Sequence, residues 1–157
     1  MVETKKIIYT TNSAAQTKKV GFLLARTVLD FSARKRAVIL SMRGELGAGK
    51  TQFAQGFAKG LGIKGTVNSP TFVILRRYGI EHPVYKTFYH IDLYRLDSET
   101  DLANLGTTEI VANPANIVVI EWPDIAKNMF SKKTLSLDFK VTGKNERQIE
   151  INSLNEK

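Results

Sequence analysis

The sequence contains no cysteine, and this absence removes several kinds of chemistry at once. Disulfide bonds, thiolate metal sites and a cysteine nucleophile are all excluded. No apolar run approaches the roughly 18 residues that a membrane-spanning helix requires. The first residues, Met1 to Lys6, lead into polar sequence and lack the apolar stretch of a secretory signal. We therefore expect a cytoplasmic protein with no membrane partner.

The charge balance is basic, with 23 lysine and arginine residues against 15 aspartate and glutamate residues and a formal net charge of +8. Such a field attracts nucleic acids and acidic proteins. The basic residues are scattered in short clusters such as 34–36, 76–77 and 132–133, and no aromatic-rich RNA-binding motif accompanies them. Two alternatives stay open: docking to a charged partner, or a generally lysine-rich composition.

The 157 residues suffice for one domain with its own core, and we find no repeat or linker that would divide residues 1–157. A first helix is expected to begin near Asn12 or Ser13, either of which can cap it, and to end at 34–36. Two short, continuously apolar runs, 37–40 and 117–120, are typical of strands covered on both faces.

The remaining segments predict further strands and helices around these runs. We expect a helix after residue 51, two antiparallel strands from Phe72 to Tyr78 and from Val84 to Ile91, a short helix opened by a capping box at 98–101 and stopping near Gly106, and a C-terminal hairpin. The sum is an α/β protein, a mixed sheet flanked by helices with antiparallel hairpins.

The segment Gly44-Glu45-Leu46-Gly47-Ala48-Gly49-Lys50-Thr51 matches the phosphate-loop pattern G-x-x-x-x-G-K-[ST] in full. Its glycines let backbone N–H groups close around phosphates, and the helix that follows adds its positive dipole end. Lys50 would reach the β- and γ-phosphates, and Thr51 would give a hydroxyl to magnesium. A P-loop NTPase-like protein that binds ATP and Mg²⁺ is predicted. We expect Lys50 to be exposed without nucleotide and to contribute little to stability.

Two acidic residues end apolar strands, where ligands bind in open α/β sheets. Glu121 follows the run 117–120 and suits a magnesium-directed acid, although a glutamate there could instead cap a helix. Asp92 follows Ile91 and could orient water or hold a magnesium-bound water, although it could instead pair with Arg95. His90 shares the sheet face of Asp92, a position where a lone histidine is more often structural than catalytic.

Four motifs in this order resemble the TsaE family, bacterial ATPases of tRNA threonylcarbamoyladenosine biosynthesis. They are the loop 44–51, Ser69-Pro70-Thr71-Phe72, His90-Ile91-Asp92-Leu93-Tyr94-Arg95-Leu96 and Glu121-Trp122-Pro123. The resemblance runs from about Thr11 to Pro123. It implies slow ATP hydrolysis in support of a TsaB–TsaD pair, which transfers a threonylcarbamoyl group to a tRNA adenosine, so that tRNA is met through the complex.

The resemblance also implies roles for individual residues. Lys50, Asp92 and Glu121 would be the catalytic set, with Thr51 and Glu121 at the metal. Thr71 would lie in a nucleotide-sensing segment, which from spacing alone is equally a proline turn leading into a strand. The remaining nucleotide contacts would come from the loop residues 45–51, from Ser13 and from Trp122.

Two other classes of protein share a phosphate loop. A nucleotide or small-metabolite kinase needs an arginine-bearing lid, and no insertion of that length is present. A GTP-dependent switch protein normally shows Asn-Lys-x-Asp and Asp-x-x-Gly, and neither string occurs. Both stay as alternatives to the ATPase.

Overall fold

The computed structural model describes residues 4–32, 34–68, 74–126 and 134–154. Its strands and helices follow one another along the chain as β1 Thr4–Thr11, α1 Ala14–Leu29, β2 Val38–Arg43, α2 Lys50–Gly60, β3 Leu75–Gly79, β4 Thr87–Asp92, α3 Glu99–Ala103, α4 Thr107–Ala112, β5 Asn116–Glu121, the 3₁₀ turn η1 Pro123–Ala126, β6 Thr134–Val141 and β7 Arg147–Leu154.

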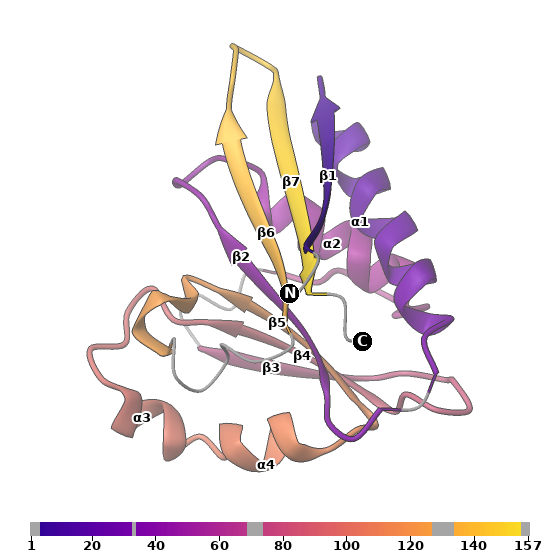
Figure 1. Cartoon of the computed structure of the whole chain (residues 1–157), viewed down its shortest axis with the longest axis vertical. Coiled ribbons are helices and arrows are strands. Elements are labelled where there is room, and N and C mark those ends of the chain that lie inside the picture. The colour runs from indigo at the N-terminus through magenta and orange to yellow at the C-terminus, as the bar shows by residue number, and fades with distance from the viewer. Residues whose placement is uncertain (1–3, 33, 69–73, 127–133, 155–157) are drawn as a thin grey trace.

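The strands form one seven-stranded sheet in the order β1-β7-β6-β2-β5-β4-β3. Its central strands β6, β2, β5 and β4 are parallel, whereas β3, β7 and β1 join by antiparallel pairing. Figure 1 shows the twisted sheet with α1 and α2 on one side and α3 and α4 on the other. The predicted α/β fold with a mixed sheet and antiparallel hairpins is confirmed.

Burial on both faces explains why the central strands are continuously apolar. Along β2, Leu40 and Met42 belong to the core beneath α1 and α2, while Ile39 belongs to the core beneath α3 and α4. In β5, Val119 and Ile120 divide between the two cores in the same way. Successive side chains of a strand point to opposite faces, so two covered faces require apolar residues at every position.

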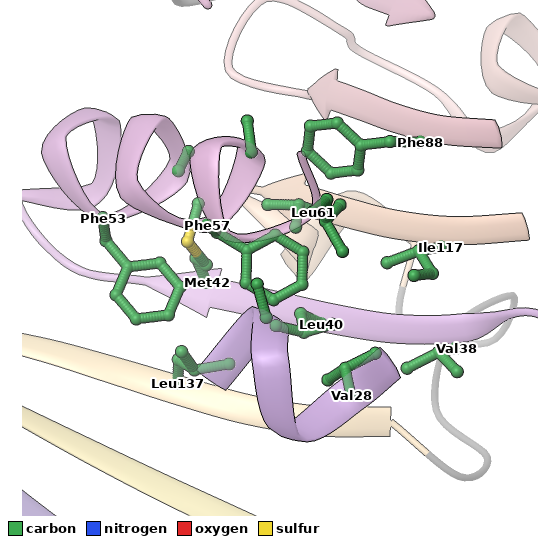
Figure 2. Close-up of a cluster of buried hydrophobic side chains, with 14 of the residues drawn as sticks. Val28, Val38, Leu40, Met42, Phe53, Phe57, Leu61, Phe88, Ile117 and Leu137 are labelled. Atoms are coloured by element: carbon green, nitrogen blue, oxygen red, sulfur yellow. The ribbon is translucent and has the colours of Figure 1, made fainter. Parts of the chain in front are cut away.

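The core beneath α2 is built around aromatic side chains, as Figure 2 shows. Phe53 and Phe57 of α2 and its C-cap residue Leu61 all lie against the sheet, as their helical spacing predicted. Phe53 stacks on Phe57 with 6.3 Å between ring centroids. Burying such side chains contributes roughly 1.5–3 kcal/mol each. Helix α2 is thereby fixed on the sheet, and its first turn is held at the end of β2.

Helices α1 and α2 pack backbone to backbone at glycines. A Cβ atom on Gly56 would lie 1.9 Å from the carbonyl oxygen of Lys18, and one on Gly21 would lie 2.2 Å from the carbonyl oxygen of Phe53. Both distances are far below van der Waals contact. These two glycines therefore set the separation of the helices.

Helix α1 begins as predicted, because Ser13 is its N-cap and the Ser13 side chain accepts a hydrogen bond from the backbone N–H of Gln16. It ends at Leu29 and not at 34–36, since the chain turns at Asp30. Strand β1 was not predicted. Among the described strands it pairs only with β7, and its sequence has three apolar residues in a row where a period-2 pattern would alternate.

Other boundaries differ in detail. The capping box at Ser98 opens α3, but α3 ends at Ala103, and a second helix, α4, begins after Gly106 and was missed. Strands β3 and β4 are antiparallel as predicted, but β3 continues to Gly79, and β4 begins at Thr87 and not at Val84. Phe72 and Val73, where the first of the two strands was expected to begin, lie outside the described residues. Strand β2 runs on to Arg43, beyond its apolar run.

We expect Gly56→Ala to destabilise the protein by about 3 kcal/mol, because the new methyl group would collide with backbone of α1 that cannot move aside. Helix propensity alone would make the alanine variant more stable by about 1 kcal/mol. A loss of stability would therefore show that the contact with α1 outweighs helix propensity. The matched control is Gly79→Ala, where no atom lies within 4 Å of the added Cβ. That variant should stay within about 0.5 kcal/mol of the wild type in urea unfolding. Equal effects of the two substitutions would contradict the packing argument.

Candidate functional site

The phosphate loop connects the end of β2 to the start of α2. Gly47 and Gly49 have φ angles of 78° and 102°, in the left-handed region that favours glycine. Gly49 is the N-cap of α2, and within the described chain this helix has no side-chain cap and no acidic residue in its first turn. The first N–H groups of a helix lack intrahelical partners, so the start of α2 presents donors suited to an anion.

Lys50 is 6% exposed, so the expectation of an exposed lysine is wrong. Its Nζ donates hydrogen bonds to the carbonyl oxygens of Gly44 and Glu45, the latter at 3.0 Å, and lies 4.4 Å from the centroid of the Trp122 ring. The loop folds back over its own lysine because carbonyl oxygens and an aromatic face satisfy the buried ammonium. A phosphate would offer the same kind of acceptor.

Burial lowers the pKa of the Lys50 ammonium below its usual value, and the carboxylates of Glu121 and Asp92 act in the opposite direction. A buried cation is disfavoured by loss of hydration and favoured by nearby negative charge. Lys50 therefore interacts electrostatically with Asp92 and Glu121, although these acids follow it by 42 and 71 residues in the sequence.

Asp92 and Glu121 stand directly opposite each other at the ends of two neighbouring parallel strands. They are 4% and 3% exposed. Oδ1 of Asp92 accepts a hydrogen bond of 2.9 Å from the N–H of Tyr94, and Oε2 of Glu121 lies 3.1 Å from Nε2 of His90. Hydrogen bonding thus helps to hold both carboxylates, and both face the side of the sheet on which α2 lies.

A pocket of about 280 Å³ forms where the loop meets these strand ends. It is lined by Leu46, Gly47, Gly49, Lys50, Thr51, Gln52, Asp92, Tyr94, Glu121 and Trp122. Eight of these residues are ones that the sequence predicts for the site, and the fold brings them together. Of the other loop residues predicted, Glu45 is exposed and Ala48 is buried, and neither lines the pocket.

Sequence reasoning did not name Tyr94 and Gln52, which also line the pocket. The ring of Tyr94 lies 5.1 Å from that of Trp122, so the two form an aromatic wall. Trp122 has a φ of 58°, uncommon for a residue other than glycine, and its N–H bonds to the carbonyl of Met42 at 3.3 Å. Tyr94 could have been recognised as a site residue because it lies two residues after Asp92, within a motif that already contains a predicted site acid.

Ser13 lies in a second hollow, of about 450 Å³, on another side of the same loop. Gly47, Gly49 and Gln52 border both spaces. Arg147 of β7 also lines the second hollow, and its Nε donates a hydrogen bond of 3.3 Å to the carbonyl of Gly47. No motif marks Arg147, because its contribution depends on a contact 100 residues apart. Thr71 and the rest of 69–73 lie outside the described residues.

The donor chemistry of the pocket fits a magnesium-bound phosphate. Mg²⁺ prefers oxygen ligands and is usually held by one or two carboxylates together with substrate phosphates. Glu121, Asp92 and the hydroxyl of Thr51 are oxygen donors at one pocket. In the described ranges, no three His, Cys, Asp or Glu side chains gather as a complete metal cage. The set therefore suits a metal that arrives with its anionic ligand.

Residues 11–149 match the family model described as threonylcarbamoyl adenosine biosynthesis protein TsaE. The chain belongs to the TsaE family. A tRNA threonylcarbamoyladenosine biosynthesis protein TsaE from Bacillus subtilis is 33% identical over 92% of this chain and 84% of its own length. The protein of that name from Borreliella burgdorferi is 40% identical over 73% of this chain and 80% of its own.

A solved structure agrees with the sequence relatives. The crystal structure of Bacillus subtilis YdiB superposes with a TM-score of 0.73 and 26% identity, covering 99% of this chain and 90% of that one. The resemblance inferred from four motifs is confirmed at the level of the family and the fold. Its match extends beyond Pro123 into the C-terminal hairpin, which carries no motif. In the described residues, no helix has the length and apolar character to cross a bilayer.

We expect Lys50→Met to reduce nucleoside triphosphate affinity roughly 10- to 100-fold, the loss of one or two hydrogen bonds to a charged group. The change also removes the positive charge that faces the buried carboxylates of Glu121 and Asp92, so we expect a lower melting temperature, and affinities are compared at a temperature at which every variant is folded. The control is Lys59→Met, which removes an exposed lysine from the same helix. Calorimetric titration with and without magnesium measures both variants. Wild-type affinity in Lys50→Met would rule out the pocket as the phosphate site.

Proposed function

We propose that this chain binds ATP with Mg²⁺ in the pocket between the phosphate loop and the strand ends, and hydrolyses it slowly. The observation that carries the proposal is the convergence of Lys50 and Thr51, at the start of α2, with Asp92 and Glu121, paired at the ends of β4 and β5. A phosphate loop alone binds phosphate. Hydrolysis also needs acids that hold the metal and orient water.

Each residue has a distinct part in this proposal. When ATP binds, the Lys50 ammonium would donate its hydrogen bonds to phosphate oxygens in place of the carbonyl oxygens of Gly44 and Glu45. Thr51 and Glu121 would hold the magnesium ion, and Asp92 would orient water or a metal-bound water. The metal would supply neutralisation of phosphate charge. The buried setting of both carboxylates strengthens their electrostatic effect, because less water screens them.

The wider role follows from the family, which functions in tRNA threonylcarbamoyladenosine biosynthesis. We propose that this chain is the ATPase subunit that supports threonylcarbamoyl transfer onto a tRNA adenosine by a TsaB–TsaD-like pair. The tRNA is then met through the complex. The excess positive charge speeds encounter with such an assembly, since electrostatic steering acts mainly on association rate.

Isosteric variants separate binding from hydrolysis. We expect Glu121→Gln and Asp92→Asn each to lower the hydrolysis rate by about 100-fold, with a smaller change in ATP affinity, because the acids act mainly on metal and water in the transition state. Asp124→Asn is the control, since this exposed acid next to the site pairs with Arg43 at 3.4 Å and does not line the pocket. Normal hydrolysis by either pocket variant would remove that residue from the mechanism.

The isolated protein should be a poor ATPase that its partners accelerate. Among the described residues that line the pocket, Lys50 is the one cation and no arginine occurs. Where an arginine finger acts in other phosphate-loop enzymes, it contributes about 10³- to 10⁵-fold in rate. Steady-state hydrolysis is measured for the chain alone and with its purified partners. Fast turnover by the chain alone would contradict this expectation.

The same assay tests the docking role of the positive charge. Replacing Arg34, Lys35 and Arg36 with glutamine should weaken stimulation by the partners, and the effect should shrink at high salt. The control removes an equal charge from the exposed residues Lys5, Lys140 and Lys144. Submicromolar, selective tRNA binding by the isolated chain would instead make it a tRNA-recognising subunit in its own right.

A further inference from the structure

His90 is a buried imidazole that the proposed function does not use. It lies on β4, is 1% exposed, and stacks on Phe88 with 24° between the ring planes. It occupies the same face of the sheet as Asp92, two residues further along the strand. A histidine in such a place can be a packing residue, so its polar contacts decide what it does.

The imidazole contacts the acid assigned to magnesium. Nε2 of His90 lies 3.1 Å from Oε2 of Glu121, and both side chains are almost completely buried. The strand register places His90 opposite Val119 of β5. Glu121 is the next residue of β5 on the same face, so the contact of the imidazole is diagonal to the strand pairing. This contact joins the middle of β4 to the metal-binding end of β5.

The direction of the hydrogen bond follows from what each group can offer. A carboxylate that binds magnesium is ionised and only accepts hydrogen bonds. Nε2 must therefore carry the proton and donate it. Nδ1 has no hydrogen-bond partner among the described residues, so a proton placed there would be buried without an acceptor. In the tautomer with the proton on Nδ1, the lone pair of Nε2 would also face a lone pair of the Glu121 carboxylate. That tautomer is therefore less stable here than the one with the proton on Nε2.

We propose that His90 is a positioning residue that holds the Glu121 carboxylate through an Nε2–H···Oε2 hydrogen bond, so that its remaining lone pairs stay directed to magnesium and its bound water. This inference rests on the proposed function, because it assigns a task to the same site. Histidine acts here through Glu121 and touches no reacting atom. Second-layer hydrogen bonds of this kind orient carboxylate ligands and tune metal affinity.

Two substitutions separate hydrogen bonding from packing. His90→Phe keeps a ring against Phe88 and removes the donor, whereas His90→Gln offers an amide N–H near the position of Nε2. We expect His90→Phe to raise the magnesium concentration needed for tight ATP binding by about 10-fold and to lower hydrolysis by at least as much. ATP binding without magnesium should be unchanged. His90→Gln should restore most of both effects, and equal defects in two folded variants would overturn the proposal.

A double-mutant cycle tests whether His90 works through Glu121. In a Glu121→Ala background, adding His90→Phe should change neither the magnesium dependence of ATP binding nor the residual hydrolysis rate, because the group to be positioned is gone. Effects of the two substitutions that simply multiply would show that His90 acts by another route, and would overturn the proposal.

A third measurement needs no nucleotide and separates this inference from the proposed function. Nitrogen-15 NMR of the full-length wild-type chain identifies which imidazole nitrogen carries the proton. We expect a proton on Nε2 of His90, with its resonance shifted in Glu121→Gln. A proton on Nδ1 alone would overturn the proposal even if the His90→Phe variant failed to fold. Failure of the wild type to bind ATP–Mg²⁺ would refute the proposed function while leaving this contact observable.

Discussion

The parallel pairing of β2, β5 and β4 determines where the loop and the two acids meet. Its register sets Met42 beside Glu121 and Glu121 beside Asp92, so three carboxyl ends meet at one edge of the sheet. The phosphate loop leaves β2 at that same edge and delivers Lys50 to the two acids. A slip of one residue would turn the acidic side chains to the opposite face. Pairing that buries apolar strands thus also assembles the pocket.

The pocket concentrates charge where water is scarce. Lys50, Asp92 and Glu121 are all buried, and each is stabilised by the others or by nearby polar groups. Breaking up such a set leaves an uncompensated buried charge, which costs far more than losing an exposed ion pair. Stability and ligand binding are therefore coupled here. The lysine rests on loop carbonyls, and a ligand's oxygens offer equivalent acceptors at little structural cost.

Local sequence signals predicted much of this arrangement. The phosphate loop, the cap at Ser13 and the apolar face of α2 depend on neighbours within a few residues, and the structure places each where its pattern indicated. The central strands were recognised because burial on both faces requires continuous apolar sequence. Strand β1 escaped notice, since an edge strand paired only with β7 needs no strict alternation. Helix α4 was not predicted because its 6 residues make fewer than two turns, too few to show a helical periodicity.

The family, the phosphate loop and the acids at the strand ends could all be recognised from short motifs and residue spacing. The folded chain was needed to show that Lys50 is buried, that Tyr94 and Trp122 form one wall, that Arg147 reaches the loop and that His90 contacts Glu121. Those facts depend on strand order and register across long separations. Sequence spacing does not give the distance in space between residues that are far apart in the chain. That distance is set by how the strands pair and how the helices pack on the sheet.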